Sequence, residues 1–130
     1  MGQARRIREI QAVTPNKAGM LAEVASAIAD AGVNIIALSA SGMGKNAKFL
    51  IVTEDNQKAI AALKAKKFDV KEGEAVSVSL GNKVGAAKEL AQKLAKAGID
   101  LDYCYGSTGN GSESLLIFST KDIEKAIGAC

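Results

Sequence analysis

One phrase of the sequence occurs twice, and this repeat constrains the fold more than any other feature. Asn-Lys-x-Gly at 16–19 is followed by Ala-Gly-x-Asn at 31–34, and the same phrase returns at 82–85 and 97–100 with Asp in the last place. One offset, from 16 to 82 and from 34 to 100, relates both parts. An offset shared by a loop, a helix and the start of a strand indicates that one supersecondary unit has been used twice.

Each copy is predicted to form a strand, a tight loop, a helix and a second strand. In the first copy, turn-forming residues fill 14–19 between an apolar run that ends at Val13 and a helical run that begins near Met20. Apolar residues recur in this helix at spacings of three and four, and Gly32 supplies its left-handed C-cap. The apolar, partly β-branched run that follows predicts a strand.

The remainder of the first unit completes a known arrangement. A glycine-rich hairpin is expected at 42–46, a central strand at 48–53, a second helix capped by Asp55 or Asn56, and a closing strand at 68–72 that Gly73 ends. Strand, helix, strand, strand, helix, strand is the ferredoxin-like βαββαβ order. We therefore predict an α+β fold with an antiparallel four-stranded sheet and both helices on one face.

The second unit repeats this order but stops early. From the hairpin at 106–112 onward the offset grows by one residue, so that Cys130 aligns with Leu63 inside the last helix. The predicted domains are 1–73 and 74–130, with residues 1–6 as a frayed basic start and the second unit lacking its closing strand. The strand at 75–80 would then have an open edge, which we expect a neighbouring unit or a second chain to cover.

Composition limits the remaining choices. With 48% hydrophobic and 24% charged residues, the chain is typical of soluble globular proteins. A unit of about 65 residues buries only about 60% of its unfolded surface, so we expect the units to pack on each other or on a second chain. The net charge of +3 is too small to indicate a nucleic-acid partner.

Other classes of site and location are also disfavoured. The chain has no histidine, and Cys104 and Cys130 lack metal-binding spacing, so neither a metal nor a cofactor is predicted. No apolar run is long enough for a membrane helix and no signal-peptide core follows the N-terminal arginines. The cytoplasm is the expected location.

No catalytic residue is predicted. Without histidine a general base must be Asp, Glu, Lys or Cys, and no pair of carboxylates is placed for cooperation. Cys104 lies between two tyrosines in an apolar strand and fits a small strand residue better than a nucleophile. The glycines of 106–111 lack the lysine and helix of a P-loop, and indicate a hairpin. We therefore do not expect an enzyme.

The loop that opens each first helix is the favoured binding site. Unpaired backbone N–H groups at a helix N-terminus attract carboxylates, and glycine at 19 and 85 lets a ligand approach the backbone. The amides of Asn16 and Asn34 suit an ammonium or a carboxylate group. The alternative is purely structural, since each of these residues is also an ordinary cap, turn or packing residue.

At these positions the sequence resembles the ACT domain family, small-molecule-sensing modules of amino-acid metabolism. The resemblance rests on the run 16–24, on 31–35 and on their second copy, and it covers nearly the whole chain as two tandem domains. It implies that an amino acid binds between paired domains. The expected site residues are Asn16, Lys17, Ala18, Gly19, Met20, Leu21, Asn34 and Ile35, with Asn82, Val84, Gly85, Ala86, Asp100 and Leu101 in the second copy.

Three functions remain to be separated. The leading hypothesis is a non-enzymatic regulatory module that binds a small amino acid at interfaces between ACT domains and modulates its own association, as a homodimer, or a metabolic partner enzyme. The second is a protein-interaction scaffold without a working ligand site, which uses the strands 49–52 and 115–118. The third, RNA binding, requires exposed aromatic residues on central strands, for which Phe49 and Phe118 are the candidates.

Overall fold

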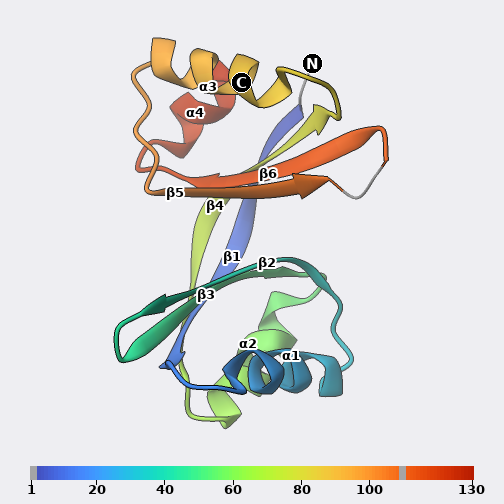
Figure 1. The fold of residues 1–130 in the computed structure, drawn as a ribbon, viewed down its shortest axis with the longest axis vertical. Helices are drawn as coiled ribbons and strands as arrows, with labels where there is room; N and C mark the ends of the chain where they lie inside the picture. The colour runs from blue at the N-terminus through green and yellow to red at the C-terminus, as the bar shows by residue number, and fades with distance from the viewer. Residues whose placement is uncertain (1–2, 109–110) are drawn as a thin grey trace. The chain divides into compact units, whose positions relative to one another are not determined.

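The computed structural model describes residues 3–108 and 111–130 (Figure 1). Within these ranges the chain forms strands and helices in an order that repeats once. The elements are β1 (Gln3–Pro15), α1 (Met20–Asp30), β2 (Ile35–Met43), β3 (Asn46–Thr53), α2 (Asn56–Ala65), β4 (Asp69–Gly81), α3 (Ala86–Lys96), β5 (Tyr103–Thr108), β6 (Glu113–Ser119) and α4 (Ile123–Ala129).

Contacts divide the chain into two units, one of which is formed by two separate segments of the sequence. Arg8–Gly73 forms one compact unit, here called the N-terminal unit. Glu74–Cys130 forms the other, here called the C-terminal unit, together with the first residues of β1 as far as Ile7. The expected domains, 1–73 and 74–130, differ from this division because residues 3–7 belong to the second unit.

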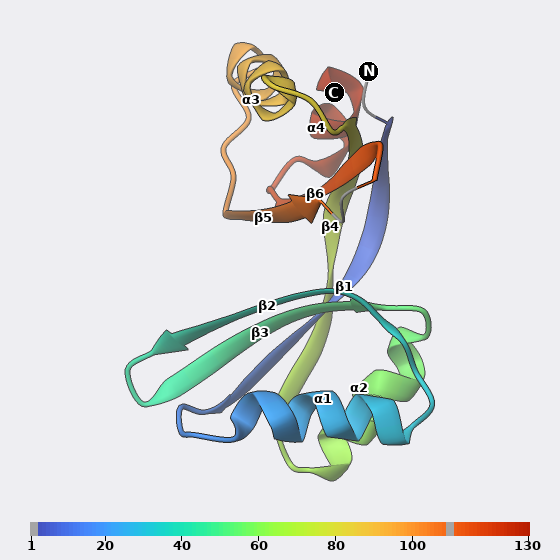
Figure 2. The ribbon, with the colours of Figure 1, turned by 45° about the vertical axis from the view of Figure 1, so that its right-hand side comes forward.

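The N-terminal unit has the predicted βαββαβ order. Its strands are hydrogen-bonded in the order β2-β3-β1-β4, and β3 runs antiparallel to both β2 and β1, with Ile10 opposite Ile51. The helices α1 and α2 cover the same face of the sheet (Figures 1 and 2). The core between helices and sheet is built from Ile10, Val24, Ile28, Phe49, Ile51 and Leu63, with smaller residues around them.

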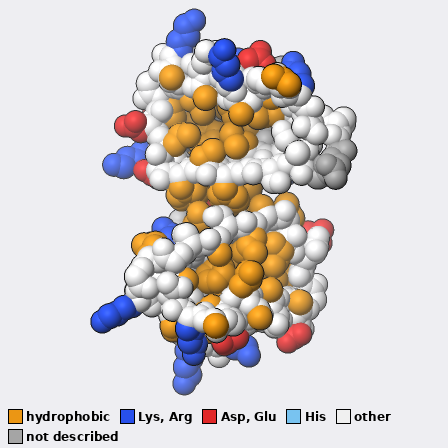
Figure 3. All heavy atoms as spheres, viewed as in Figure 1, with side chains coloured by type: hydrophobic (Ala, Val, Ile, Leu, Met, Phe, Trp, Pro, Cys, Tyr) orange, Lys and Arg blue, Asp and Glu red, His pale blue; other side chains and the backbone are white. Residues whose placement is uncertain are grey.

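The C-terminal unit repeats the arrangement with β4, β6 and β5 as neighbours. Val76 of β4 lies opposite Phe118 of β6. The helices α3 and α4 pack against the face of the sheet that carries these two side chains. Figure 3 shows hydrophobic side chains gathered between the helices and the strands of each unit. The core residues here are Val76, Val78, Leu80, Leu90, Leu94 and Phe118. The predicted ferredoxin-like class is therefore confirmed for both copies.

The closing strand of the C-terminal unit comes from the beginning of the chain. Among the described residues no strand follows α4, as predicted, and residues 3–7 of β1 occupy the place beside β4. Ala4 packs on the core of this unit, and Arg6 forms ion pairs with Glu74, at 2.9 Å, and with Glu124. The hydrogen bond to Glu74 raises the pKa of Arg6 above its ordinary value.

Two sequence-based expectations are thus wrong. Residues 3–6 are not a frayed start, because they pair in a sheet and contact a core. Gly73 does not end a strand, because β4 continues through it without a positive φ. The ion pair between Arg8 and Glu72, at 3.3 Å, and that between Arg6 and Glu74 follow one antiparallel register of β1 and β4.

Turns and caps otherwise follow the predicted chemistry. Gly44, with φ of 68°, forms the first hairpin turn with Lys45. Asp55 caps α2 by accepting a hydrogen bond from the backbone of Lys58 at 3.2 Å, and Asp122 caps α4 in the same way. β5 and β6 extend further into the second hairpin than expected, and part of that hairpin, 109–110, lies outside the described residues.

Within residues 3–108 and 111–130, no helix combines the length and the apolar character that are needed to span a bilayer.

We predict that a charge at Ala4 destabilises the C-terminal unit. Ala4→Asp places a carboxylate against an apolar core, which costs about 1–3 kcal/mol when the group has no partner. Gln3→Asp makes the same change of charge at an exposed neighbouring position and should alter the stability by less than about 0.5 kcal/mol. Urea unfolding followed by circular dichroism measures both. Equal midpoints for the two variants would show that β1 does not close this unit.

Candidate functional site

The first helix of each unit begins without a side-chain cap. Gly19 precedes α1 with φ of 91°, and Gly85 precedes α3 with φ of 87°. A Cβ atom on either glycine would meet nothing within 4 Å, so the left-handed backbone, not crowding, favours glycine here. The second helices, in contrast, are capped by aspartates. The N–H groups at the starts of α1 and α3 are therefore suited to an anionic ligand.

The asparagine of each loop has a structural role. The backbone N–H of Asn16 donates to the carbonyl of Lys45 at 2.9 Å, and its side-chain amide donates to the carbonyl of Gly44 at 3.0 Å. Asn82 makes the equivalent bonds in the C-terminal unit, where its side chain donates to the carbonyl of Gly111 at 3.0 Å. In each unit this residue fastens the loop before the first helix to the hairpin between the second and third strands.

Asn34 lies at the other end of α1. Its side-chain amide donates to Glu54 at 3.5 Å, and its carbonyl accepts from the backbone of Glu54 at 3.1 Å. α1 has 11 residues and is therefore about 16 Å long. Within this unit, Asn16 and Asn34 are separated by the length of the helix, so one small amino acid cannot contact both.

The other expected site residues fall into two groups. Met20 and Ala86 are buried, and Ile35 packs against the core of its unit. The remainder are exposed, with Leu21 at 54% and Leu101 at 40% of their full accessibility. The exposed group comprises Lys17, Ala18, Gly19, Leu21, Val84, Gly85, Asp100 and Leu101. The buried residues position the helix starts, and the exposed ones are accessible to a ligand or a partner.

A hollow of about 300 Å³ lies at the start of α3. It brings together Asn82 and Ala86, both expected from the sequence, with Lys83 and with hydroxyl residues of β5 and β6. The hydroxyl residues are Ser107, Thr108 and Ser114. A cation, hydroxyl groups and an uncapped helix start can together hold a carboxylate. These hydroxyl groups were not predicted from the sequence, although their place in the hairpin next to the loop was a usable signal.

A second hollow, of about 380 Å³, lies at the end of α3. It contains Asp100 and Leu101 from the expected set, with Asp102, Thr120 and Lys125 around them. The hydroxyl group of Thr120 donates to the backbone carbonyl of Asp100 at 2.7 Å, which fixes the backbone there. The acidic groups suit an ammonium. The residues expected to form one second site are thus divided between two ends of one helix.

Phe49 and Phe118, the two aromatic candidates for RNA stacking, are not accessible. Both are buried in the cores of their units, at 2% and 0% exposure. Neither ring can stack on a base while the unit is folded, and the hypothesis of RNA binding through these residues is therefore not supported.

We predict that removing the asparagine amide weakens each unit to a similar extent. Asn16→Ala and Asn82→Ala each delete one neutral hydrogen bond between a loop and a hairpin, which costs about 1 kcal/mol. Lys17→Ala, at an exposed position of the same loop, should change stability by less than about 0.5 kcal/mol. Denaturant midpoints measure the difference. An unchanged midpoint in both asparagine variants would contradict the structural role.

Comparison with known proteins agrees with this architecture. Residues 6–129 match the family model of an ACT domain pair, and no curated protein matches significantly. The structure of protein BT0572 from Bacteroides thetaiotaomicron has 25% identity and a TM-score of 0.88, over 97% of this chain and 87% of that one. The ligand-free regulatory subunit of aspartate kinase from Thermus thermophilus has 17% identity and a TM-score of 0.70, over 99% and 94%.

The aspartokinase alpha and beta subunits have 19% identity and a TM-score of 0.68, over 98% of this chain and 93% of that one. At these identities the two kinase structures show a shared fold alone. The family model, in contrast, matches nearly the whole chain and both copies of the repeat, so the protein belongs to the ACT domain pair family.

Proposed function

We propose that the chain is a non-enzymatic regulatory module that binds a small amino acid at interfaces between ACT domains. The observation that carries this proposal is the difference in capping. In both units the first helix starts at a left-handed glycine with no side-chain cap, whereas the second helix has an aspartate cap. An uncapped start is a site for a carboxylate, and an amino acid supplies one.

The two ends of the first helix suit the two charges of an amino acid. The N–H groups near Gly19 and Gly85 are at the positive end of a helix dipole and favour a carboxylate. Asn34 and Asp100, at the opposite end, offer oxygen atoms to an ammonium. Since the ends are about 16 Å apart in one domain, a single ligand reaches both kinds of group only when they come from different domains.

Such a ligand would favour the paired state of the domains. It gains its full set of contacts only when two domains meet, so its binding shifts the equilibrium towards association. The regulated partner in this proposal is a second copy of the chain or an amino-acid metabolic enzyme. The likeness of the fold to a regulatory subunit of aspartate kinase supports this kind of role.

Exposed apolar residues on β2 support self-association. Ile36 is 53% exposed and Leu38 is 37% exposed, and β2 is the last strand in the order of its sheet. An edge strand with apolar side chains is a surface on which another strand can pair. We propose a homodimer on this basis.

The alternative is an interaction scaffold in which the ligand site does not function. One observation favours it, because the amide of Asn16 already bonds the hairpin and is engaged in holding the loop. The scaffold hypothesis predicts a partner that binds equally well with or without amino acids. The experiment below separates the two.

We expect at least one amino acid to raise the melting temperature and to shift the oligomeric state. A ligand present at a hundred times its Kd stabilises the folded form by about 2.7 kcal/mol. Asn34→Ala should weaken this ligand roughly tenfold, since a hydrogen bond to a charged group contributes about 1.5–3 kcal/mol. Gln92→Ala removes an exposed amide on α3 and serves as the matched control.

The test measures thermal shift and binding heat with each of the common amino acids. Sedimentation measures the oligomeric state. If no amino acid gives heat, a thermal shift or a change in association, the regulatory proposal is wrong. If an amino acid binds and Asn34→Ala responds as the wild type does, the assignment of the ammonium site is wrong.

A further inference from the structure

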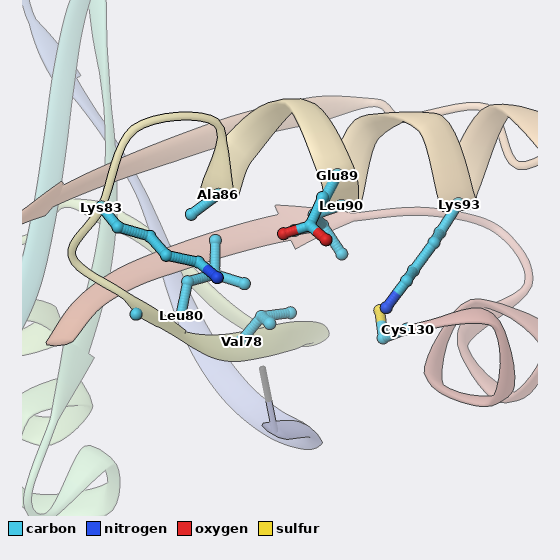
Figure 4. A pocket seen from close by; sticks show the side chains of 9 residues that line it. Val78, Leu80, Lys83, Ala86, Glu89, Leu90, Lys93 and Cys130 are labelled. Carbon is cyan, nitrogen blue, oxygen red and sulfur yellow. The ribbon is translucent and has the colours of Figure 1, made fainter. Parts of the chain in front are cut away.

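A further cavity of the C-terminal unit lies between α3 and β4 (Figure 4). It shares Leu80, Gly81, Lys83 and Ala86 with the hollow at the start of α3. Its volume is about 290 Å³. Its floor is apolar, and is formed by Val78 and Leu80 of β4 and Leu90 of α3. It extends towards Cys130 and away from the hydroxyl residues that line the hollow at the start of α3.

Comparison of the two repeats explains why this space is open. Ala86 occupies the position that Met20 has in the N-terminal unit, and Cys130 occupies the position of Leu63. Met20 and Leu63 are 5% and 0% exposed and belong to the core of their unit. The shorter side chains of the C-terminal unit leave room where the longer ones fill the equivalent place.

Charged groups surround the apolar floor. Lys83 comes from the loop before α3, and Glu89 and Lys93 come from the helix itself. Figure 4 shows the Lys83 and Glu89 side chains reaching over the floor, and the Lys93 ammonium beside the sulfur of Cys130. Two cations and one carboxylate give an excess of one positive charge. This rim favours a ligand with a single negative charge and disfavours a dianion.

The volume sets the size of the ligand. A cavity of about 150 Å³ holds benzene, so this one accommodates roughly eight to twelve non-hydrogen atoms. An aliphatic chain can cover the floor formed by Val78, Leu80 and Leu90, and its contact with these residues is favoured by removal of apolar surface from water.

We propose that this cavity binds an aliphatic monocarboxylate, with the carboxylate between Lys83 and Lys93 and the chain on the apolar floor. The site adjoins the helix start to which an amino-acid carboxylate is assigned above, since Lys83 and Ala86 line both. It is distinguished from that hollow by Glu89, Lys93 and Cys130, which line this cavity alone. An aliphatic amino acid and the corresponding simple acid share the recognised chemistry, and they differ in an ammonium group that the Glu89 carboxylate of the rim would attract.

Cys130 provides a reporter of occupancy in the unmodified chain. Burial raises the pKa of its thiol, and the positive charge of Lys93 opposes this shift, so alkylation should be measured at mildly alkaline pH. Cys104 is exposed on β5, does not line the cavity, and is the internal control. The rates of alkylation by iodoacetamide at the two thiols are followed by peptide mass spectrometry.

We expect 4-methylpentanoate to slow the alkylation of Cys130 and not that of Cys104. The neutral 4-methylpentanamide should need a roughly tenfold higher concentration to give the same protection, because a charge-assisted hydrogen bond is lost. The same increase is expected for 4-methylpentanoate when it is tested on the Lys83→Gln variant. Leucine should protect Cys130 at least as well as 4-methylpentanoate, because Glu89 attracts its ammonium group. The amine 3-methylbutylamine, which has no carboxylate, should not protect. Protection by the amine and not by the acids would overturn the proposal, as would equal protection of both thiols or of neither.

A matched pair of variants locates the ligand. Ala86→Met introduces the residue of the other repeat into the cavity and should abolish protection of Cys130. Ala91→Met makes the same change at an exposed position of α3 outside the cavity and should leave protection intact. Full protection in Ala86→Met would overturn the proposal. If Ala86→Met does not fold, Lys83→Gln decides.

Lys83 and Ala86 line both the cavity and the hollow at the start of α3, so a variant outside both is needed to separate this proposal from the amino-acid sensor. Asn34→Ala should leave protection of Cys130 unchanged, because Asn34 lies in the other unit. Failure of the sensor would therefore appear as a missing response to amino acids with protection by 4-methylpentanoate retained, and failure of the cavity proposal would appear as the reverse.

Discussion

The structure depends on the pairing of two long strands, β1 and β4, each of which contributes residues to both units. Among the described residues from Glu74 onward the C-terminal unit has three strands, and the beginning of β1 supplies a fourth. Ala4 adds to its core, and Arg6 connects the strand to Glu74 and to Glu124 of α4. A small unit buries little surface, so the added strand is a substantial part of its stabilisation. The two domains are consequently not independent segments of the sequence.

Much of this fold could be predicted, because the repeat gives the same elements twice. The turn and cap residues, such as Asp55 and Asp122, act locally and have clear sequence signatures. The role of residues 3–7 could not be predicted in this way, since three nearby arginines resemble a solvated terminus and the partner strand is some seventy residues away. The prediction that a strand ends at Gly73 was wrong for a related reason, because a glycine in an extended conformation does not interrupt a strand.

The candidate site was only partly accessible from sequence. Asn16 and Asn82 were singled out as ligand contacts by their repetition, but repetition alone does not distinguish a ligand contact from a structural one. Their amides bond backbone carbonyls of Gly44 and Gly111, and a carbonyl has no side-chain signature. The sequence did contain a signal for this role, because Gly44 and Gly111 are separated by the same offset that relates the two hairpins. The separation of Asn16 and Asn34 also follows from the length of the intervening helix.

The two units share the same backbone features and differ in their side chains. Both keep a left-handed glycine before the first helix, an asparagine that fastens the loop to a hairpin, and an aspartate cap on the second helix. The differences concern volume and charge: Ala86 for Met20 in the core, and Asp100 for Asn34 at the helix end. A scaffold whose shape is set by backbone bonds tolerates such changes without a change of fold. The same architecture can therefore present two chemically different surfaces, one in each unit, and a carboxylate at Asp100 favours a cationic group more strongly than the neutral amide of Asn34 does.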